Sequence, residues 1–125
     1  MDKNMINWFE VAVSDFERAK KFYEAIFNFE IQTAEMGGST MGFFPYEPNS
    51  GKVSGAIVAG EMNTPGADGA TLYFNGDPDL SDVLGRVEAA GGKVVMPKTQ
   101  ITPEIGYMAF FMDTEGNRLA LHSQN

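Results

Sequence analysis

Residues 7–27 read NWFEVAVSDFERAKKFYEAIF, and this stretch combines two hydrophobic periods. The first part alternates, which places Trp8 and Glu10 on one face of a strand and an all-apolar set on the other. From Phe16 to Phe27 the apolar residues recur three and four positions apart, which is typical of an amphipathic helix. Ser14, with Glu17 three residues on, predicts a capping box at the start of that helix. We therefore expect a strand followed directly by a helix that covers its apolar face.

The rest of the chain repeats this order. Three further strands are expected at 29–33, 40–44 and 53–59, before a segment rich in glycine and proline at 60–69 that is typical of a linker. A second half then follows, with Asp77 as the N-cap and Pro78 as the first residue of its helix. Its other elements are a helical stripe that ends at Gly91-Gly92 and strands at 71–75, 93–96, 107–112 and 118–123.

The element order predicts an α+β domain over residues 1–125, built from two tandem βαβββ modules. The first module covers about residues 5–60 and the second about 70–125, with the linker at about 60–69. An offset of 64 residues aligns Asp15 with Asp79 and Ala56 with Ala120. Each half has one helix to cover one face of its sheet, so the other face stays open. We expect the two open faces, related by pseudo-two-fold symmetry, to enclose a cleft that is the natural ligand site.

Composition excludes several function classes. The chain has 9 basic and 17 acidic residues, a net charge of −8, which argues against binding to nucleic acid or to an anionic membrane surface. It has no cysteine and one histidine, which excludes disulfides, thiolate metal sites and sites that need two imidazoles. The start Met1-Asp2-Lys3-Asn4 lacks a signal-peptide pattern, and no apolar run is long enough to span a bilayer. The expected location is the cytoplasm.

Three motifs resemble the vicinal oxygen chelate superfamily, which includes glyoxalases, bleomycin-resistance proteins and extradiol dioxygenases. The stretch NWFEVAVSD with RAKKFY at 18–23 is similar to the first strand and helix of that family. AAGGKV at 89–94 is similar to the end of its second helix. DTEGNRL at 113–119 is similar to its D-P-x-G-N turn, with Thr114 in place of proline. The resemblance covers nearly the whole chain and implies the glyoxalase/bleomycin resistance fold, but this family hosts many chemistries.

The resemblance also implies where a metal would bind. Metal-dependent members hold one divalent ion with side chains from the first and last strands of each half. In this sequence those positions fall on Trp8, Ala56, Ala120 and Thr71, or on Leu72 if the register shifts by one. None of these side chains is a good ligand for a divalent cation. We therefore expect no metal at the usual site and no cofactor.

Glu10 and His122 are the candidate catalytic residues. Glu10 interrupts an apolar strand, so it is either a pocket carboxylate that binds a ligand or acts as a base, or a structural carboxylate within the sheet or a dimer interface. His122 lies two residues after Ala120 on the same strand face and could act as a general acid–base, although a lone histidine is more often structural. A Glu10–His122 pair across the cleft is the sharpest chemical prediction. A shifted divalent metal site on these two residues is conceivable, but two ligands rarely suffice.

Other residues are expected to bind a ligand. Trp8 can supply a flat wall that stacks on an aromatic ring or attracts a cation, and Tyr73 and Asn75 can orient polar groups. Each also has an ordinary packing role as its alternative. Phe43 belongs to a set of alternating strand residues that line either the core or the pocket, together with Met41, Met108, Phe110 and Met112. Tyr46 and Glu47 follow the third strand and could cover the mouth of the cleft.

Three functions remain open. The first is a metal-free protein that binds a small organic molecule, as bleomycin-resistance relatives do. The second is an enzyme of lyase, isomerase or dioxygenase type that uses Glu10 and His122, with or without a divalent metal. The third is an accessory domain whose cleft is filled by its own side chains, which the lack of a cavity beside Trp8 would favour. The resemblance also implies a homodimer, which would bury open sheet edges.

Overall fold

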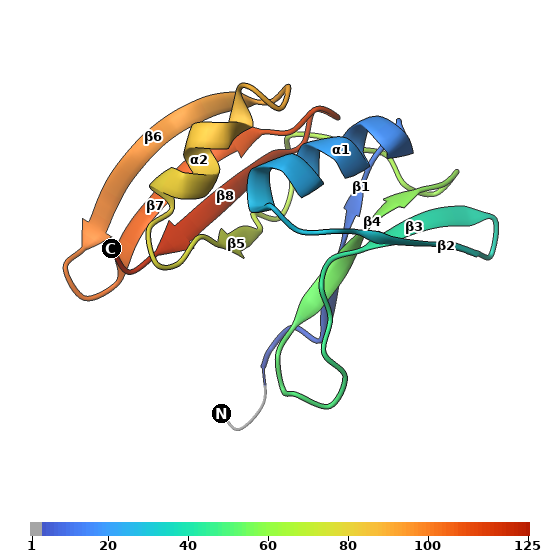
Figure 1. Ribbon diagram of the computed structural model, residues 1–125, viewed down its shortest axis with the longest axis horizontal. Coiled ribbons are helices and arrows are strands. Elements are labelled where there is room, and N and C mark those ends of the chain that lie inside the picture. Colours follow the sequence, from blue (N-terminus) through green and yellow to red (C-terminus); the bar gives the residue numbers. More distant parts are fainter. Residues whose placement is uncertain (1–3) are drawn as a thin grey trace.

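The computed structural model describes residues 4–125 and contains two mixed four-stranded sheets (Figure 1). Sheet A has the strand order β1-β4-β3-β2 and consists of β1 (Trp8–Ala12), β2 (Gln32–Met36), β3 (Ser39–Phe43) and β4 (Ser54–Ala59). Sheet B has the order β5-β8-β7-β6 and consists of β5 (Tyr73–Asn75), β6 (Lys93–Thr102), β7 (Gly106–Met112) and β8 (Arg118–Ser123). Helix α1 (Phe16–Phe27) follows β1, and helix α2 (Ser81–Val87) follows β5.

The strand pairing is the same in the two sheets. β1 runs parallel to β4 and β5 runs parallel to β8, whereas the remaining neighbours are antiparallel. Ala56 lies opposite Glu10 in sheet A, and Ala120 lies opposite Tyr73 in sheet B. The two tandem βαβββ modules and the α+β class predicted from the element order are therefore confirmed.

Helix α1 begins one residue later than the capping box predicted. Its N-cap is Asp15, whose side chain accepts a hydrogen bond from the Arg18 N–H at 3.1 Å. Ser14 instead donates its hydroxyl to the Glu115 carboxylate at 3.0 Å, so this hydroxyl is engaged away from the helix. The helix ends at Asn28, a left-handed C-cap with φ of 58° whose N–H bonds to the Glu24 carbonyl.

Helix α2 is shorter than predicted and does not begin at Pro78. Asp77 accepts a hydrogen bond from the Gln124 N–H at 2.9 Å, so its carboxylate joins the end of β8 and does not cap the helix. Asp79 accepts from the Ser81 N–H at 2.9 Å, and the buried Leu80 N–H donates to the Ser123 hydroxyl at 2.9 Å. The predicted start is wrong because Asp77 and Leu80 form hydrogen bonds with residues at the end of β8 before the helix begins.

Three strands differ from their predicted ranges by two residues or more, among them β5, which begins at Tyr73 and not at residue 71. β6 extends to Thr102, beyond the expected end at Met96, and it contains Pro97. Proline is tolerated there because β6 is the edge strand of sheet B and needs no N–H on its free side. β2 starts at Gln32, because the apolar residues before it enter the core: Ile31 is buried and Phe29 packs against the core residues.

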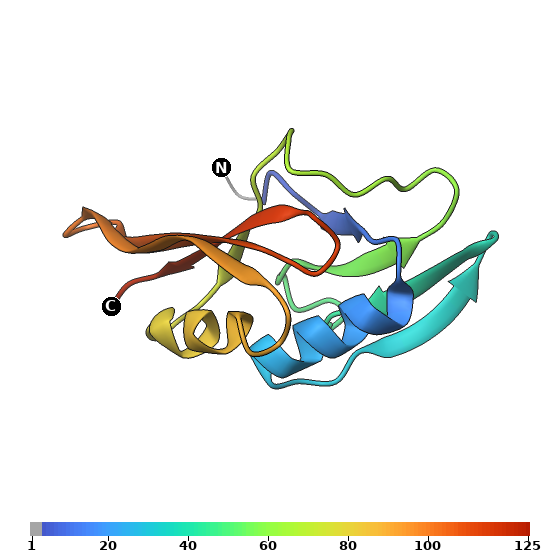
Figure 2. The same ribbon diagram turned by 90° about the horizontal axis from the view of Figure 1, so that it is seen from above.

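One hydrophobic core joins the two modules. From α1 it takes Phe22, Tyr23 and Ile26, all fully buried, and the Phe22 ring lies 6.1 Å from the ring of Phe111 on β7. The Arg86 side chain of α2 also donates a hydrogen bond to the Ile26 carbonyl at 2.9 Å. In the view of Figure 2, both helices lie on one side of the strands, while the linker runs on the other side. Neither helix of residues 4–125 is long and apolar enough to cross a bilayer.

Candidate functional site

The open face of sheet A carries an aromatic wall. Val11 and Val13 enter the core, as the alternation predicted, whereas Trp8 is only half-buried. The Trp8 ring lies 6.1 Å from that of Phe43 and 5.4 Å from that of Tyr46, which meets it edge to face. Beside this wall is a pocket of about 720 Å³, lined by Asn4, Asn7, Trp8, Tyr46, Glu47, Asn49, Ser50, Gly51, Lys52 and Val53. A cavity beside Trp8 is therefore present, which counts against an accessory domain with a filled cleft.

Glu10 lies in a different place from Trp8, although both belong to β1. Its side chain is exposed and lines a smaller pocket of about 290 Å³ against the linker residues Thr64, Gly66 and Asp68. The linker thus lies along the side of β1 that the alternation left open. Arg118 lines the same pocket, so a carboxylate and a guanidinium share its wall.

The open face of sheet B carries the remaining predicted residues. Tyr73 is 52% exposed, and its ring meets that of Phe110 edge to face at 5.9 Å. The Asn75 side-chain oxygen accepts a hydrogen bond from the Asp77 N–H at 2.8 Å. Both residues line a pocket of about 420 Å³ together with His122.

His122 makes one short polar contact that fixes its ring. Its Nε2 atom lies 2.6 Å from the Ile105 carbonyl oxygen. Because a carbonyl oxygen can only accept, Nε2 is the donor in this contact. Within one chain, His122 and Glu10 line different pockets on different sheets, so one chain does not bring the two together. The Glu10–His122 pair stays a prediction.

The family's metal positions hold side chains that do not fit a divalent ion. Ala56 pairs with Glu10 in sheet A, and Ala120 pairs with Tyr73 in sheet B. Trp8 lies on β1 two residues before Glu10, and Thr71 lies just before β5, two residues before Tyr73. Trp8 and Thr71 therefore occupy equivalent positions in the two modules. Of the four residues only Thr71 offers an oxygen, and that oxygen accepts a hydrogen bond from Arg118 at 3.0 Å. Among residues 4–125, no three His, Cys, Asp or Glu side chains are grouped so that they could share a metal ion.

Arg118 is the site residue that the sequence did not single out. Its guanidinium lies 5.4 Å from the centre of the Phe110 ring, and its buried Nε has no hydrogen-bond partner in the described part of the chain. The alternation along the last strand already placed Arg118 on the same strand face as Ala120, two residues later. However, arginine next to a turn is so common on protein surfaces that the residue type alone carried no signal.

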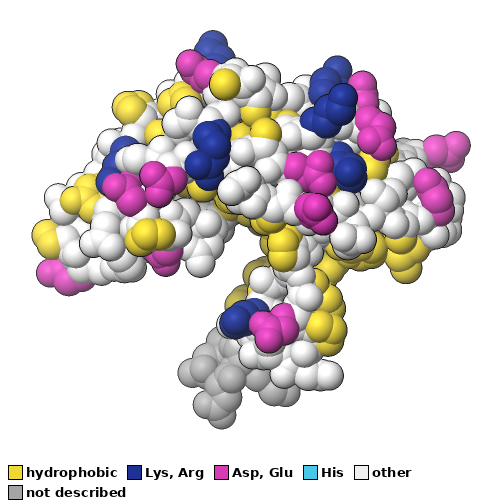
Figure 3. All heavy atoms as spheres, viewed as in Figure 1, with side chains coloured by type: hydrophobic (Ala, Val, Ile, Leu, Met, Phe, Trp, Pro, Cys, Tyr) yellow, Lys and Arg dark blue, Asp and Glu magenta, His cyan; other side chains and the backbone are white. Residues whose placement is uncertain are grey.

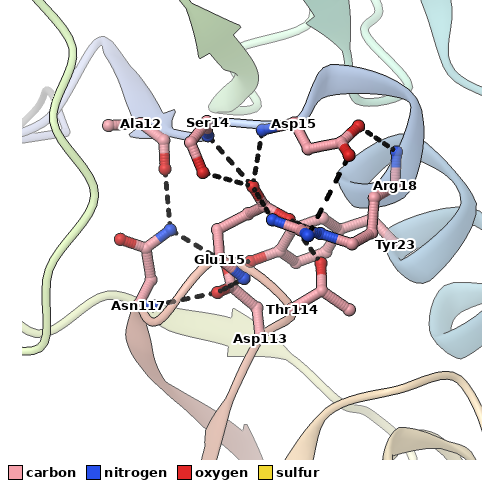
Figure 4. Close-up of polar contacts among 9 residues, drawn as sticks. All are labelled: Ala12, Ser14, Asp15, Arg18, Tyr23, Asp113, Thr114, Glu115 and Asn117. Atoms are coloured by element: carbon pink, nitrogen blue, oxygen red, sulfur yellow. Dashed lines mark hydrogen bonds and ion pairs between the residues drawn. The ribbon is translucent and has the colours of Figure 1, made fainter.

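The turn between β7 and β8 connects the two modules through buried polar groups (Figure 4). Asp113 accepts hydrogen bonds from the Tyr23 hydroxyl at 2.7 Å and from the Asn117 side chain at 2.9 Å. Asn117 in turn donates to the Ala12 carbonyl at the end of β1 at 2.7 Å. Burial, followed by the charge of Asp113, raises the pKa of Tyr23 well above its ordinary value, so it stays a neutral donor.

Glu115 of the same turn binds the start of α1. Its carboxylate accepts from the Ser14 and Asp15 N–H groups at 3.0 and 2.7 Å, and from the Arg18 guanidinium at 2.7 Å. Burial is the largest single influence on the pKa of Glu115 and raises it, but the hydrogen bonds from Arg18, Asp15, Thr114 and Ser14 together lower it to about 2. None of the residues of this network lines the pocket beside Trp8, and their hydrogen bonds join the two modules.

The comparisons with known proteins agree with this architecture. The family model of the Glyoxalase/Bleomycin resistance protein/Dioxygenase superfamily matches residues 5–121. A glyoxylase-like domain-containing protein of Didymella fabae is 32% identical over 123 residues, which cover 93% of this chain and 91% of that protein.

Two solved structures are also similar to this chain in fold. TnmS3, an antibiotic binding protein from Streptomyces sp. CB03234, is 25% identical with a TM-score of 0.69 and covers 100% of this chain and 99% of its own. A glyoxalase/bleomycin resistance protein from the same organism is 26% identical with a TM-score of 0.69, and the match covers 94% of this chain and 100% of that one. This chain belongs to the Glyoxalase/Bleomycin resistance protein/Dioxygenase superfamily.

Proposed function

We propose that this protein binds a small organic molecule against Trp8, without a metal ion and without changing the molecule chemically. The observation that carries the proposal is the pocket of about 720 Å³ whose wall is formed by the Trp8 and Tyr46 rings. Its volume lies within the usual range for small-molecule sites, and two aromatic rings at right angles offer a planar ligand both a face and an edge. Asn7 and Glu47 in the lining can bind polar substituents.

Two further observations support binding over metal chemistry. The four family ligand positions carry Trp8, Ala56, Thr71 and Ala120, of which only the threonine is polar. One similar structure is that of an antibiotic binding protein, and the match extends over the full length of both chains. Catalysis by Glu10 and His122 ranks second, because the two residues line separate pockets of one chain.

We also propose that the protein acts as a homodimer. In one chain, the wall around Trp8 and the face that carries Tyr73 and His122 belong to different pockets. A second copy can place the open face of its sheet B opposite the open face of sheet A, which would complete a cleft from both chains.

The net charge of −8 favours cationic ligands over anionic ones through the long-range field.

The experiment is a titration that uses Trp8 as the reporter, since it is the single tryptophan of the chain. Proflavine, a planar aromatic cation, should quench the Trp8 emission to saturation and raise the melting temperature by about 2–6 °C at saturating dye. Anthraquinone-2-sulfonate, planar but anionic, should do neither at the same concentration. Tyr46→Ala should weaken proflavine binding, whereas the control Met62→Ala, at a 95% exposed linker residue outside the pocket, should not.

Metal content is measured on the same preparation, purified without chelator or affinity tag. Less than about a tenth of an equivalent of any transition metal per chain is expected. Close to one equivalent of a divalent metal would overturn the metal-free proposal. If Tyr46→Ala leaves the proflavine quenching unchanged, the ligand does not bind against the Trp8 wall.

A further inference from the structure

A second cavity lies on the opposite side of β1 from the aromatic wall. It is a crevice of about 570 Å³ where the projecting lower end of sheet A meets β5 and the end of α1. Figure 3 shows hydrophobic side chains gathered where that projecting end joins the body of the molecule. We call it the phenylalanine crevice, because its lining includes Phe9, Phe27, Phe29, Phe44 and Phe74.

The rings of the crevice are held in place by the core. The Phe74 ring lies 5.6 Å from Phe9 and 5.3 Å from Phe27, in both cases edge to face. Phe44 and Phe74 also contact the ring of the fully buried Tyr23, at 5.5 and 6.0 Å. The walls are therefore preformed and present ring faces and edges at several angles, which is the arrangement that aromatic molecules prefer.

The charge of the lining selects the kind of ligand. The residues that line the phenylalanine crevice are all uncharged, whereas the other pockets described above each contain acidic or basic residues. An ion placed there would lose its hydration without gaining a counter-charge. Three polar side chains of the lining are already engaged: Ser54 donates to the Pro45 carbonyl at 2.8 Å, Thr71 accepts from Arg118, and the Asn75 oxygen accepts from the Asp77 N–H. Tyr73, which is 52% exposed, is the fourth polar residue of the lining, so the crevice offers a polar ligand few free groups.

We propose that the phenylalanine crevice is a second binding site, which takes a neutral planar aromatic molecule. Its volume is that of a small-molecule cavity, and it is a hollow between two sheets with rings on its walls, unlike the flat surface that a protein partner covers. The proposal does not depend on the function assigned to the wall around Trp8, because Phe9 and Trp8 lie on opposite faces of β1 and the two cavities share only Val53 in their linings.

The probe is N-phenyl-1-naphthylamine, a neutral aromatic amine whose emission rises in apolar surroundings. Its emission should saturate at about one equivalent per chain. Ile6 lies at the mouth, is 54% exposed and lines no other pocket described above, so Ile6→Glu should leave the fold intact. The new charge should weaken probe binding by about tenfold or more. Ile6→Leu should retain it, and so should the control Val95→Glu, at a 51% exposed residue of β6 outside the crevice.

Several outcomes would overturn the proposal. The absence of saturable emission excludes the site. If Ile6→Glu and Val95→Glu bind the probe equally well, the probe binds outside the phenylalanine crevice. If Ile6→Glu converts a dimer into a monomer in sedimentation, a second copy of the chain occupies the crevice. Displacement of the probe by proflavine would mean that both compounds bind one site, the one at Trp8. Loss of proflavine binding with probe binding intact would instead reject the proposed function alone.

Discussion

At the scale of single residues, the Glu115 carboxylate holds the start of α1 to the turn of sheet B. It is fully buried yet charged, with donors from Ser14, Asp15 and Arg18. Glu115→Gln keeps the shape but removes the charge and one acceptor, and it turns an amide toward groups that also donate. We expect a loss of about 1–3 kcal/mol in the free energy of unfolding at pH 7, measured by urea denaturation. Glu104→Gln, at an exposed residue of the β6–β7 turn, should change it by less than about 0.5 kcal/mol.

The same residue predicts a pH dependence. The pKa of Glu115 is lowered to about 2 in the folded protein from an ordinary value of 4.5. Its stabilising effect is therefore complete above pH 4.5 and is lost as the pH falls through 2. Urea unfolding at several pH values should show a steeper acid loss of stability in the unsubstituted protein than in Glu115→Gln. Parallel curves for the two proteins would show that this carboxylate is not the group that titrates.

At the scale of elements, two glycines near the end of α2 should respond in opposite directions to alanine. Gly85 lies within α2 with nothing near the position of a Cβ, so Gly85→Ala should stabilise the protein by about 0.5–1 kcal/mol. At Gly92, a Cβ would lie 2.6 Å from both the Met112 carbonyl oxygen and the Phe22 ring. Gly92→Ala should therefore destabilise it by about 1–3 kcal/mol. Thermal unfolding of both variants checks the pair, and a stable Gly92→Ala would mean that β6 can move away from α1.

The elements also show what a sequence can and cannot predict here. Strand β8 was predicted with its full range, and the stripe of α1 was correct, because in both cases the hydrophobic period itself sets the element. The starts of both helices were wrong, because Ser14 and Asp77 bind to Glu115 and Gln124, which are distant in sequence. The phenylalanine crevice was also missed. Its rings come from α1, β5 and three other segments, and no local pattern reveals that they surround a hollow.

At the scale of the whole molecule, the two modules are held together by their helices and one core, and the candidate site residues divide between two sheets. Trp8 lies with sheet A, and Tyr73 lies with sheet B in another pocket. The sequence correctly placed these residues on strand faces. It could not show whether the faces meet within one chain, because alternation fixes the direction of a side chain and carries no information on how two sheets are oriented.

A mixing experiment separates the two arrangements. Trp8→Ala and Tyr73→Ala should each lose proflavine binding, measured by the dye's own fluorescence anisotropy. If each cleft combines sheet A of one chain with sheet B of the other, a mixed dimer has one site with both substitutions and one with neither. Unfolding and refolding an equal mixture should then restore about a quarter of the sites, since half of the dimers are mixed. If each cleft lies within one chain, every site keeps one substitution and no binding returns. We expect the restored quarter, because the pocket beside Trp8 in a single chain contains no residue of sheet B.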